Sequence, residues 1–300
     1  MKKLFSLFLL IIALISFSCK DDSGPTADDT NPTIKKSKKR GIAFDMASVN
    51  DFKAISPGIS WWYNWYFVAN QNTPADYYNT YGMDFIPMLW GGNTSANDMT
   101  LVKSFILAHP EIQYLLVMNE PNLIDQANRT PVQAASDWIK YEQVISDLAA
   151  SGRTVYLVGP AMTWGTMPNY SDPVVWLDSF YVKYKAANNG RPPKIDYLAF
   201  HWYDYGLSSQ LDRLNKYGKK IWVTEMANWN PQINSYSKQA VQMSEMVAIC
   251  ENRTDVFRYA WFYGRGTLPD NHFTYLFTQN DGELSDLGKL YISLPYNSGQ

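Results

Sequence analysis

The chain has 300 residues, of which 46% are hydrophobic and 15% aromatic, and its formal net charge is −2 at pH 7. This length and apolar content suffice for one large domain with a full core. The near-neutral charge excludes the clustered basic face that nucleic-acid binding requires, so no nucleic-acid partner is expected. Ligands of little charge, such as glycans, suit this composition better.

The first predicted element is an export signal over residues 1–18. A basic start precedes an apolar run that is too short to span a bilayer comfortably, and small residues lead to Cys19. Residues 16–19 resemble a bacterial lipobox with a displaced aliphatic residue, so we expect a lipoprotein signal peptide and lipidation of Cys19. Residues 20–22 resemble the export signal of surface lipoproteins of Bacteroidota, which predicts an outer-membrane protein facing the cell exterior. An ordinary signal peptide with a free cysteine is the alternative.

A disordered tether is predicted next, over residues 19–39. From Ser23 to Lys39 the chain has almost no apolar residue, and such a composition cannot offset the entropy lost on ordering. The folded domain is therefore expected to span residues 40–300.

The domain has one cysteine, Cys250, in a segment with helical periodicity, so we expect a small buried hydrophobe and no disulfide. The three histidines are His109, His201 and His272, and they have no recognisable metal-ligand spacing. No metal and no cofactor are expected.

Eight short apolar runs alternate with helical patterns, which predicts parallel strands joined by crossover helices. The predicted strands are Gly41–Asp45, Ile59–Trp65, Asp84–Trp90, Tyr114–Asn119, Val155–Pro160, Ile195–Tyr203, Lys220–Glu225 and Arg258–Phe262. The predicted helices are Thr100–His109, Pro131–Ser151, Pro173–Asn188, Ser208–Tyr217 and Ser237–Asn252. Eight strands close a barrel, so we expect a single α/β domain with the (β/α)8 TIM-barrel fold. Helices between the first strands should be short.

Glutamates stand at the ends of two predicted strands: Glu120 after the fourth and Glu225 at the end of the seventh. The C-terminal ends of barrel strands carry the catalytic residues of such folds. A pair of carboxyl groups about 5–5.5 Å apart is the arrangement of a retaining glycoside hydrolase. We therefore predict this activity, with Glu120 as acid/base and Glu225 as nucleophile. A pair of capping or salt-bridged carboxylates is the structural alternative.

Six motifs in order resemble glycoside hydrolase family 128, a clan A family described as β-1,3-glucanases. They are Trp61–Trp65, Phe85–Trp90, Val117–Asn122, Leu157–Ala161, Ala199–Tyr203 and Trp222–Glu225. The similarity covers residues 40–292. It implies a β-1,3-glucan of laminarin or curdlan type as substrate, and we expect a monomer with endo action. The loops after the strands decide between endo and exo action, and exo action is the alternative.

The resemblance also implies substrate contacts. Asn119 would hydrogen-bond the sugar 2-hydroxyl, a contact that strengthens in the transition state. His201 and Tyr203 alternate on one strand and share a face; by resemblance Tyr203 would orient Glu225, and His201 would line the same pocket. The candidates for stacking on sugar rings are Trp61, Trp65, Trp90, Trp164, Trp202 and Trp261, and those for hydroxyl contacts are Asn64 and Asn93.

Other tryptophans and glutamates are assigned structural roles. Trp138 and Trp176 fall in helical patterns, and Trp222 has the opposite strand parity to Glu225, so all three are expected in the core. The glutamates expected on solvated faces are Glu111, Glu142, Glu245 and Glu251.

Two functions of other classes remain as alternatives. A non-catalytic glycan-binding surface lipoprotein would keep the barrel and the tryptophans without turnover, and a structural or adhesive surface protein would show no saturable glucan affinity. Among enzymes, the alternative is another clan A glycanase, such as a mannanase, a xylanase or a β-1,6-glucanase.

Overall fold

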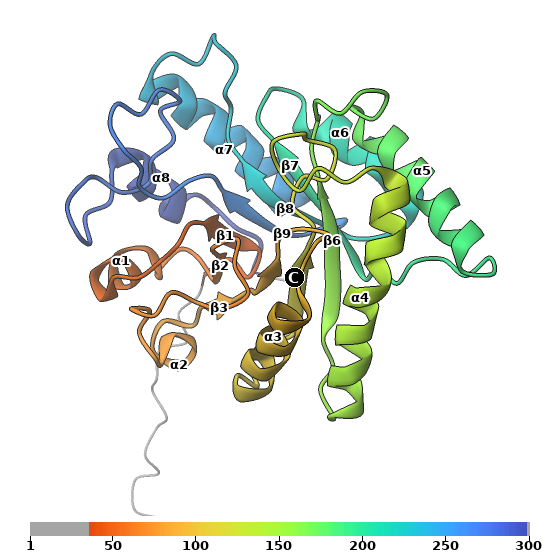
Figure 1. Ribbon diagram of the computed structural model, residues 1–300. Coiled ribbons are helices and arrows are strands. Elements are labelled where there is room, and N and C mark those ends of the chain that lie inside the picture. The colour runs from red at the N-terminus through yellow and green to blue at the C-terminus, as the bar shows by residue number, and fades with distance from the viewer. Residues whose placement is uncertain (1–35, 299–300) are drawn as a thin grey trace, which may run out of the picture. The chain divides into compact units, whose positions relative to one another are not determined.

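Nine parallel strands form one sheet in the order β3-β2-β1-β9-β8-β7-β6-β5-β4. The structure, a computed structural model, describes residues 36–298, so the predicted signal peptide, Cys19 and residues 19–35 of the tether lie outside the described part. The sheet is curled, and helices pack around its outer side (Figure 1). The strands are β1 Arg40–Ala43, β2 Trp61–Tyr63, β3 Asp84–Phe85, β4 Met88–Leu89, β5 Tyr114–Val117, β6 Tyr156–Met162, β7 Tyr197–Trp202, β8 Ile221–Met226 and β9 Val256–Trp261.

The helices alternate with the strands, as the sequence predicts, and the first two are short. They are α1 Val49–Ile55, α2 Tyr77–Tyr81, α3 Ala96–Ala108, α4 Pro131–Ala150, α5 Pro173–Ala187, α6 Leu207–Leu214, α7 Tyr236–Asn252 and α8 Asp286–Ser293. The helix α3 begins four residues earlier than predicted because Ser95 and Asp98 form a capping box there. Among residues 36–298, none of the helices combines the length and apolar character needed to cross a membrane.

One predicted strand, Asp84–Trp90, is divided into β3 and β4. These two strands lie at opposite ends of the sheet order, although only Ile86 and Pro87 separate them in the chain. The amide of Ile86 donates to the carbonyl of Trp62 at 3.0 Å, and the carbonyl of Pro87 accepts from the amide of Leu116 at 2.9 Å. One short segment thus pairs with β2 on one side and with β5 on the other.

Two hydrophobic layers flank the sheet. The inner layer fills the curl and includes Trp61, Tyr63 and Trp222. The outer layer lies between sheet and helices, where Trp138 and Trp176 are fully buried. The prediction that these two helical tryptophans belong to the core is confirmed.

Trp222 is also buried, but not for the predicted reason. The pairing register of β8 shifts between Val223 and Met226. Such an irregularity changes the side-chain alternation of a strand. Trp222 packs in the inner layer, and Glu225 reaches the same interior, where it accepts a hydrogen bond from Tyr63. The inferred opposite parity is therefore wrong.

Residues 36–39 belong to the folded domain, which corrects the predicted end of the tether. Ser37 is 2% and Lys39 7% exposed. The Lys39 ammonium donates to the carbonyls of Cys250, Glu251 and Arg253 at the C-terminal end of α7, where a cation is favoured by the helix dipole. The sequence of this segment does not indicate these contacts, because the residues that bind Lys39 lie more than 200 positions away in the chain.

Glu251 is buried rather than solvated, so that prediction is wrong. Its carboxylate accepts from the hydroxyls of Ser37 and Tyr259, both at 2.6 Å, and lies 3.5 Å from the Arg40 guanidinium. Glu111 and Glu142 are partly buried, and Glu245 is exposed as predicted. Cys250 is a buried free thiol, as predicted, and burial raises its pKa.

Candidate active site

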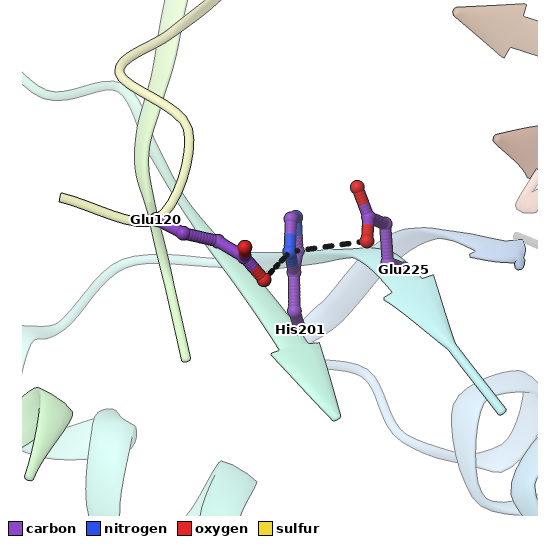
Figure 2. A group of neighbouring side chains, drawn as sticks. All are labelled: Glu120, His201 and Glu225. Atoms are coloured by element: carbon purple, nitrogen blue, oxygen red, sulfur yellow. Dashed lines mark hydrogen bonds and ion pairs between the residues drawn. The ribbon is translucent and has the colours of Figure 1, made fainter. Parts of the chain in front are cut away.

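The two predicted catalytic glutamates follow or end β5 and β8, and they lie on either side of His201 (Figure 2). The imidazole of His201 stands between them, with Nδ1 2.8 Å from Oε1 of Glu120 and 3.4 Å from Oε2 of Glu225. One oxygen of each carboxyl group and a nitrogen of His201 all lie within 4.8 Å of one another. The sequence placed these groups on separate strands, and the fold brings them together.

The backbone around this group is strained. Trp65, Met118 and Glu120 have φ angles of 59°, 58° and 45°. This left-handed region costs a residue other than glycine on the order of 1–3 kcal/mol and is concentrated at functional sites. A hydrogen bond from the Glu120 amide to the Ala161 carbonyl, at 2.8 Å, ties this strained segment to β6.

Glu225 is surrounded by hydrogen-bond donors. The hydroxyl of Tyr63 and the indole Nε1 of Trp65 both donate to its Oε1 at 2.7 Å. The hydroxyl of Tyr203 donates to its Oε2. Burial first, and then the negative charge of Glu225, raises the pKa of both tyrosines well above the usual value. The tyrosines therefore remain protonated and act as donors, and their hydrogen bonds fix the position of the Glu225 carboxyl group.

His201 is fully buried. Burial opposes its positive form, but the charges of Glu225 and Glu120 and the hydrogen bond to Glu120 outweigh that effect and raise its pKa. Its other nitrogen, Nε2, has no hydrogen-bond partner among the described residues. His201 thus links the two carboxyl groups through one nitrogen.

The same three side chains could in principle hold a metal ion, since each offers a ligand atom within the 4.8 Å cluster. The sequence predicted no metal site. The carboxyl oxygens of Glu225 already accept hydrogen bonds from two tyrosine hydroxyls and one indole N–H group. The arrangement is suited to chemistry carried out by a pair of carboxyl groups.

A cleft of about 1040 Å³ opens above the glutamates. This volume is at the upper end of the range for small-molecule sites, roughly 300–1,000 Å³. Its walls are rich in aromatic rings and carry a few polar groups. The lining residues are Trp65, Trp90, Asn119, Glu120, Leu123, Asp125, Gln126, Thr163, Trp164, Trp202, Tyr203, Asp204, Gln210, Glu225, Trp229, Phe262 and Tyr263.

Four of the six tryptophans predicted for stacking line the cleft, and two do not. Trp61 and Trp261 are 0% exposed. The Nε1 of Trp61 donates to the Lys39 carbonyl at the beginning of β1, deep below the cleft. The ring of Trp261 packs against Tyr291 on the helix side of the sheet. Neither ring presents a face to a ligand, so both predictions are corrected.

The three predicted asparagines differ in position. Asn64 does not line the cleft, because its amide donates to Asp45 Oδ1 at 3.0 Å and to a loop carbonyl; its predicted hydroxyl contact is corrected to a structural role. Asn93 lines an adjoining 270 Å³ pocket that shares Trp65 and Trp90 with the cleft. Asn119 lines the cleft itself, next to Glu120.

Four aromatic residues of the site are not predicted from the sequence: Tyr63, Trp229, Phe262 and Tyr263, of which the last three line the cleft. Tyr63 contacts Glu225 directly, and the signal in the sequence is the alternation of Trp61, Tyr63 and Trp65 along β2 and just after it. Trp229 stacks on Tyr203 at 4.0 Å between ring centroids and is 36% exposed. Phe262 packs edge-on against Tyr203 at 5.7 Å. The position of Trp229 just beyond a strand that ends in glutamate could have indicated its role.

The family model described as Glycosyl hydrolase catalytic core matches residues 41–291. A solved GH128 (subgroup II) endo-β-1,3-glucanase from Pseudomonas viridiflava is 55% identical, with 87% of this chain and 100% of that chain covered and a TM-score of 0.82. The chain belongs to glycoside hydrolase family 128. A second subgroup II member, from Sorangium cellulosum, is 32% identical over 86% and 99% of the two chains, with a TM-score of 0.72.

More distant GH128 relatives extend the comparison. A subgroup I endo-β-1,3-glucanase from Amycolatopsis mediterranei, solved with laminaritriose, is 26% identical over 85% and 99% of the chains, with a TM-score of 0.63. Alkali-sensitive linkage protein 1 of Schizosaccharomyces pombe is 28% identical over 86% of this chain, which spans only 45% of that relative's length. The family assignment of this GH128 chain agrees with the resemblance of its six motifs.

Proposed function

We propose that this glycoside hydrolase is a retaining endo-β-1,3-glucanase. The observation that carries the proposal is the pair of carboxyl groups at the base of the cleft, with oxygens of Glu120 and Glu225 within 4.8 Å of each other. Retaining enzymes place the two carboxyl groups about 5–5.5 Å apart, and inverting enzymes about 6.5–9.5 Å. The GH128 relatives named as endo-β-1,3-glucanases support β-1,3-glucan as the substrate.

The proposed reaction is a double displacement. The carboxylate of Glu225 attacks the anomeric carbon while Glu120, as acid, protonates the leaving glycosidic oxygen. Glu120 then removes a proton from water, which attacks the anomeric carbon and releases Glu225. Tyr63, Trp65 and Tyr203 hold the carboxyl group of Glu225 in a fixed position, so that it is oriented for attack.

Endo action is supported by the distribution of exposed rings. Trp90, Trp164 and Trp229 are 37%, 44% and 36% exposed, and they stand on loops after β4, β6 and β8. Aromatic surfaces therefore surround the carboxyl pair on several sides, as an internal segment of a polysaccharide requires. Asn119 would bind the sugar 2-hydroxyl beside Glu120.

The finer fold also belongs to this proposal. We infer that the curled sheet closes into a (β/α)8 barrel, with the Asp84–Leu89 segment as the eighth strand. The support is that β3 and β4 stand at the two ends of the sheet order and are separated by two residues. In a closed barrel, the C-terminal ends of β5 and β8 would lie on the same rim, where other barrel enzymes have their active sites.

The proposed location is the outer membrane, facing the cell exterior, with a monomeric catalytic domain tethered through a lipid on Cys19. This part rests on the sequence of residues 1–22. Metabolic labelling with a radioactive fatty acid tests it: the wild type should incorporate label, and Cys19→Ser should not. Label in both proteins, or in neither, would contradict lipidation at Cys19.

Product analysis by mass and chromatography tests the activity. The purified protein should cleave laminarin and curdlan but not β-1,4- or β-1,6-linked glucans, and it should release oligosaccharides of several sizes. Glu225→Gln should lower turnover by about 10⁴- to 10⁶-fold, as in enzymes that lose a nucleophile, and should still bind laminarin. Binding without cleavage in both proteins would instead indicate a glycan-capture lipoprotein.

Azide rescue tests the two roles separately. With Glu225→Ala, azide should replace the nucleophile and give a glycosyl azide of inverted configuration. With Glu120→Ala, azide should attack the covalent intermediate and give a glycosyl azide of retained configuration. Exchanged configurations would reverse the two assignments.

A further inference from the structure

Trp164 is an exposed ring of the cleft wall, and a cluster of polar side chains fixes its position. Its Nε1 donates to Oε1 of Gln210 at 3.0 Å. The guanidinium carbon of Arg213 lies over the indole, 5.3 Å from the ring centroid. The ring is nevertheless 44% exposed and lines the cleft, so it still has free surface there.

Arg213 joins the members of this cluster. Its Nη1 donates to the same Oε1 of Gln210 at 3.1 Å, and its Nη2 donates to Oδ2 of Asp172 at 2.5 Å. Asp172 is itself held in place, because its other oxygen caps α5 by accepting from the amide of Val174. The planar fork of an arginine can make both bonds while stacking on an aromatic face, and a lysine cannot.

The position of Trp164 relative to the two glutamates indicates which part of a substrate it meets. The Glu120 amide is bonded to the carbonyl of Ala161, and the carbonyl of Thr163 accepts from the side-chain amide of Asn122 at 2.6 Å. The segment that carries Trp164 is therefore bonded on both sides of residue 162 to the segment that carries the acid/base.

Gly165 fixes the same region. A Cβ atom at this position would lie 2.0 Å from the carbonyl oxygen of Asn122, so only glycine permits this close approach of the two loops. The other end of the cleft differs, because there Trp65 is bonded to the nucleophile Glu225. The leaving sugar departs past the acid, whereas the donor sugar remains over the nucleophile. Trp164 therefore borders the leaving-group side.

We propose that Arg213 is a positioning residue that, together with Gln210, holds Trp164 as the stacking platform of an acceptor subsite for β-linked glucosyl units. The inference rests on the proposed function and extends it. An acceptor subsite binds the leaving part of the substrate in the first step and can bind a second glucan in the next.

The same subsite gives the enzyme a transfer activity besides hydrolysis. In the transfer step a hydroxyl of the bound acceptor forms a bond to the anomeric carbon, and the bond from that carbon to Glu225 breaks. The hydroxyl proton passes to Glu120, and Glu225 leaves as a carboxylate. Water competes for the same intermediate, so the occupancy of the platform sets the ratio of transfer to hydrolysis.

Two substrates distinguish the acceptor side from the donor side. Laminarihexaose occupies both sides of the cleavage point, whereas a 4-nitrophenyl β-laminarioligoside has only the aryl group beyond it. Arg213→Met should lower kcat/KM for laminarihexaose by about 3- to 10-fold, mainly through KM, the size expected from losing a cation–π contact and its hydrogen bonds. It should leave kcat/KM for the aryl substrate nearly unchanged and reduce transfer products.

Three further variants complete the test. Trp164→Ala should have the same pattern with a larger effect, and combining it with Arg213→Met should add little. Arg213→Lys should restore only part of the loss. The matched control is Arg191→Met, which removes a guanidinium lying 5.1 Å from the ring centroid of Tyr184 away from the cleft; it should affect neither substrate.

Equal losses on both substrates, or no loss in Arg213→Met and Trp164→Ala, would overturn the inference while leaving the glucanase activity intact. A wild-type protein that cleaves no β-1,3-glucan would instead overturn the proposed function itself. The two failures are distinguishable, because only in the second is the Arg191→Met control inactive as well.

Discussion

Aromatic rings lie at both the N-terminal and the C-terminal ends of the strands, yet the two groups of rings have different roles. At the end where the strands begin, the rings pack on one another around Arg258, which is paired with Asp84 at 2.6 Å. At the end where they finish, the rings border a cleft with two carboxyl groups at its base. The rings of the first end are Trp61, Tyr114, Tyr156, Tyr197, Trp222 and Phe257.

Strand β2 and the residues just after it connect the two ends and show what separates them. Trp61 is buried near the strand's beginning, Tyr63 contacts Glu225 halfway, and Trp65 reaches the cleft. All three residues are aromatic and share a face. Their position along the chain therefore decides whether a ring packs in the core or contacts the catalytic groups and the cleft.

At the cleft end, Glu120→Gln should have the largest effect after the Glu225→Gln change described above. Turnover of β-1,3-glucan should fall by about 10²- to 10⁴-fold, the contribution of a general acid, while the melting temperature changes little. An aryl glycoside whose leaving group needs no proton should lose much less in the first step. Equal losses on both substrates would contradict the acid role.

At the N-terminal ends of the strands, Trp222→Ala should lower the stability of the fold and leave the activity of the folded protein nearly unchanged. Removing a fully buried indole that packs against Trp61 and Arg258 should lower the free energy of unfolding by about 3–5 kcal/mol. Urea denaturation measures this change. Below the transition, kcat/KM should remain within a few-fold of wild type, and a selective loss of activity without destabilisation would refute the division between the two ends.

A matched pair of tyrosines at the two ends of β7 sharpens the comparison: Tyr197 is its first residue, and Tyr203 directly follows its last. Tyr203→Phe removes a hydrogen bond to the Glu225 carboxylate, which should lower kcat by about 10- to 100-fold, since hydrogen bonds to charged groups contribute about 1.5–3 kcal/mol. Tyr197→Phe removes the same hydroxyl group at the packed end of β7 and should leave kcat unchanged. Similar kinetics for the two variants would show that position along the strand has no influence.

The smallest effect is a pH dependence of stability that arises from His201. Because the neighbouring glutamates raise its pKa in the folded state, its contribution is fully present below the unfolded-state pKa of about 6.5. This contribution is lost as the pH rises through the higher folded-state pKa. Denaturation of wild type and His201→Gln from pH 5 to 9 should show a stability difference that narrows with rising pH. A difference that stays constant would contradict the raised pKa, because it would mean that His201 binds protons equally in the folded and unfolded states.

The sequence predicts the frame of this molecule well because its signals are local. Each of the eight apolar runs overlaps an observed strand, and glutamates at two strand ends indicate where the carboxyl groups meet. Trp61 is wrongly predicted to line the cleft, because the alternation of side chains along a strand shows which face a residue lies on but not how far it lies from the cleft. Trp222 received the wrong parity because the register shift in β8 leaves no mark in its residue types.

Other features could not be read from local pattern at all. The burial of Glu251 depends on Ser37 and Arg40, which are more than 200 residues away in the chain. The polar cluster around Trp164 likewise joins residues from three separate segments. Such contacts are fixed by the packing of the whole fold.

The attachment of residues 36–39 has a practical consequence for handling the protein. Arg40, at the beginning of β1, donates to the carbonyls of Leu294 and Pro295, so the two limits of the folded domain are pinned together where the strands start. The cleft opens where the strands finish. A bead or sensor chip coupled at either limit would therefore present the cleft mouth outward, and insoluble glucan particles could reach it without releasing the enzyme from its support.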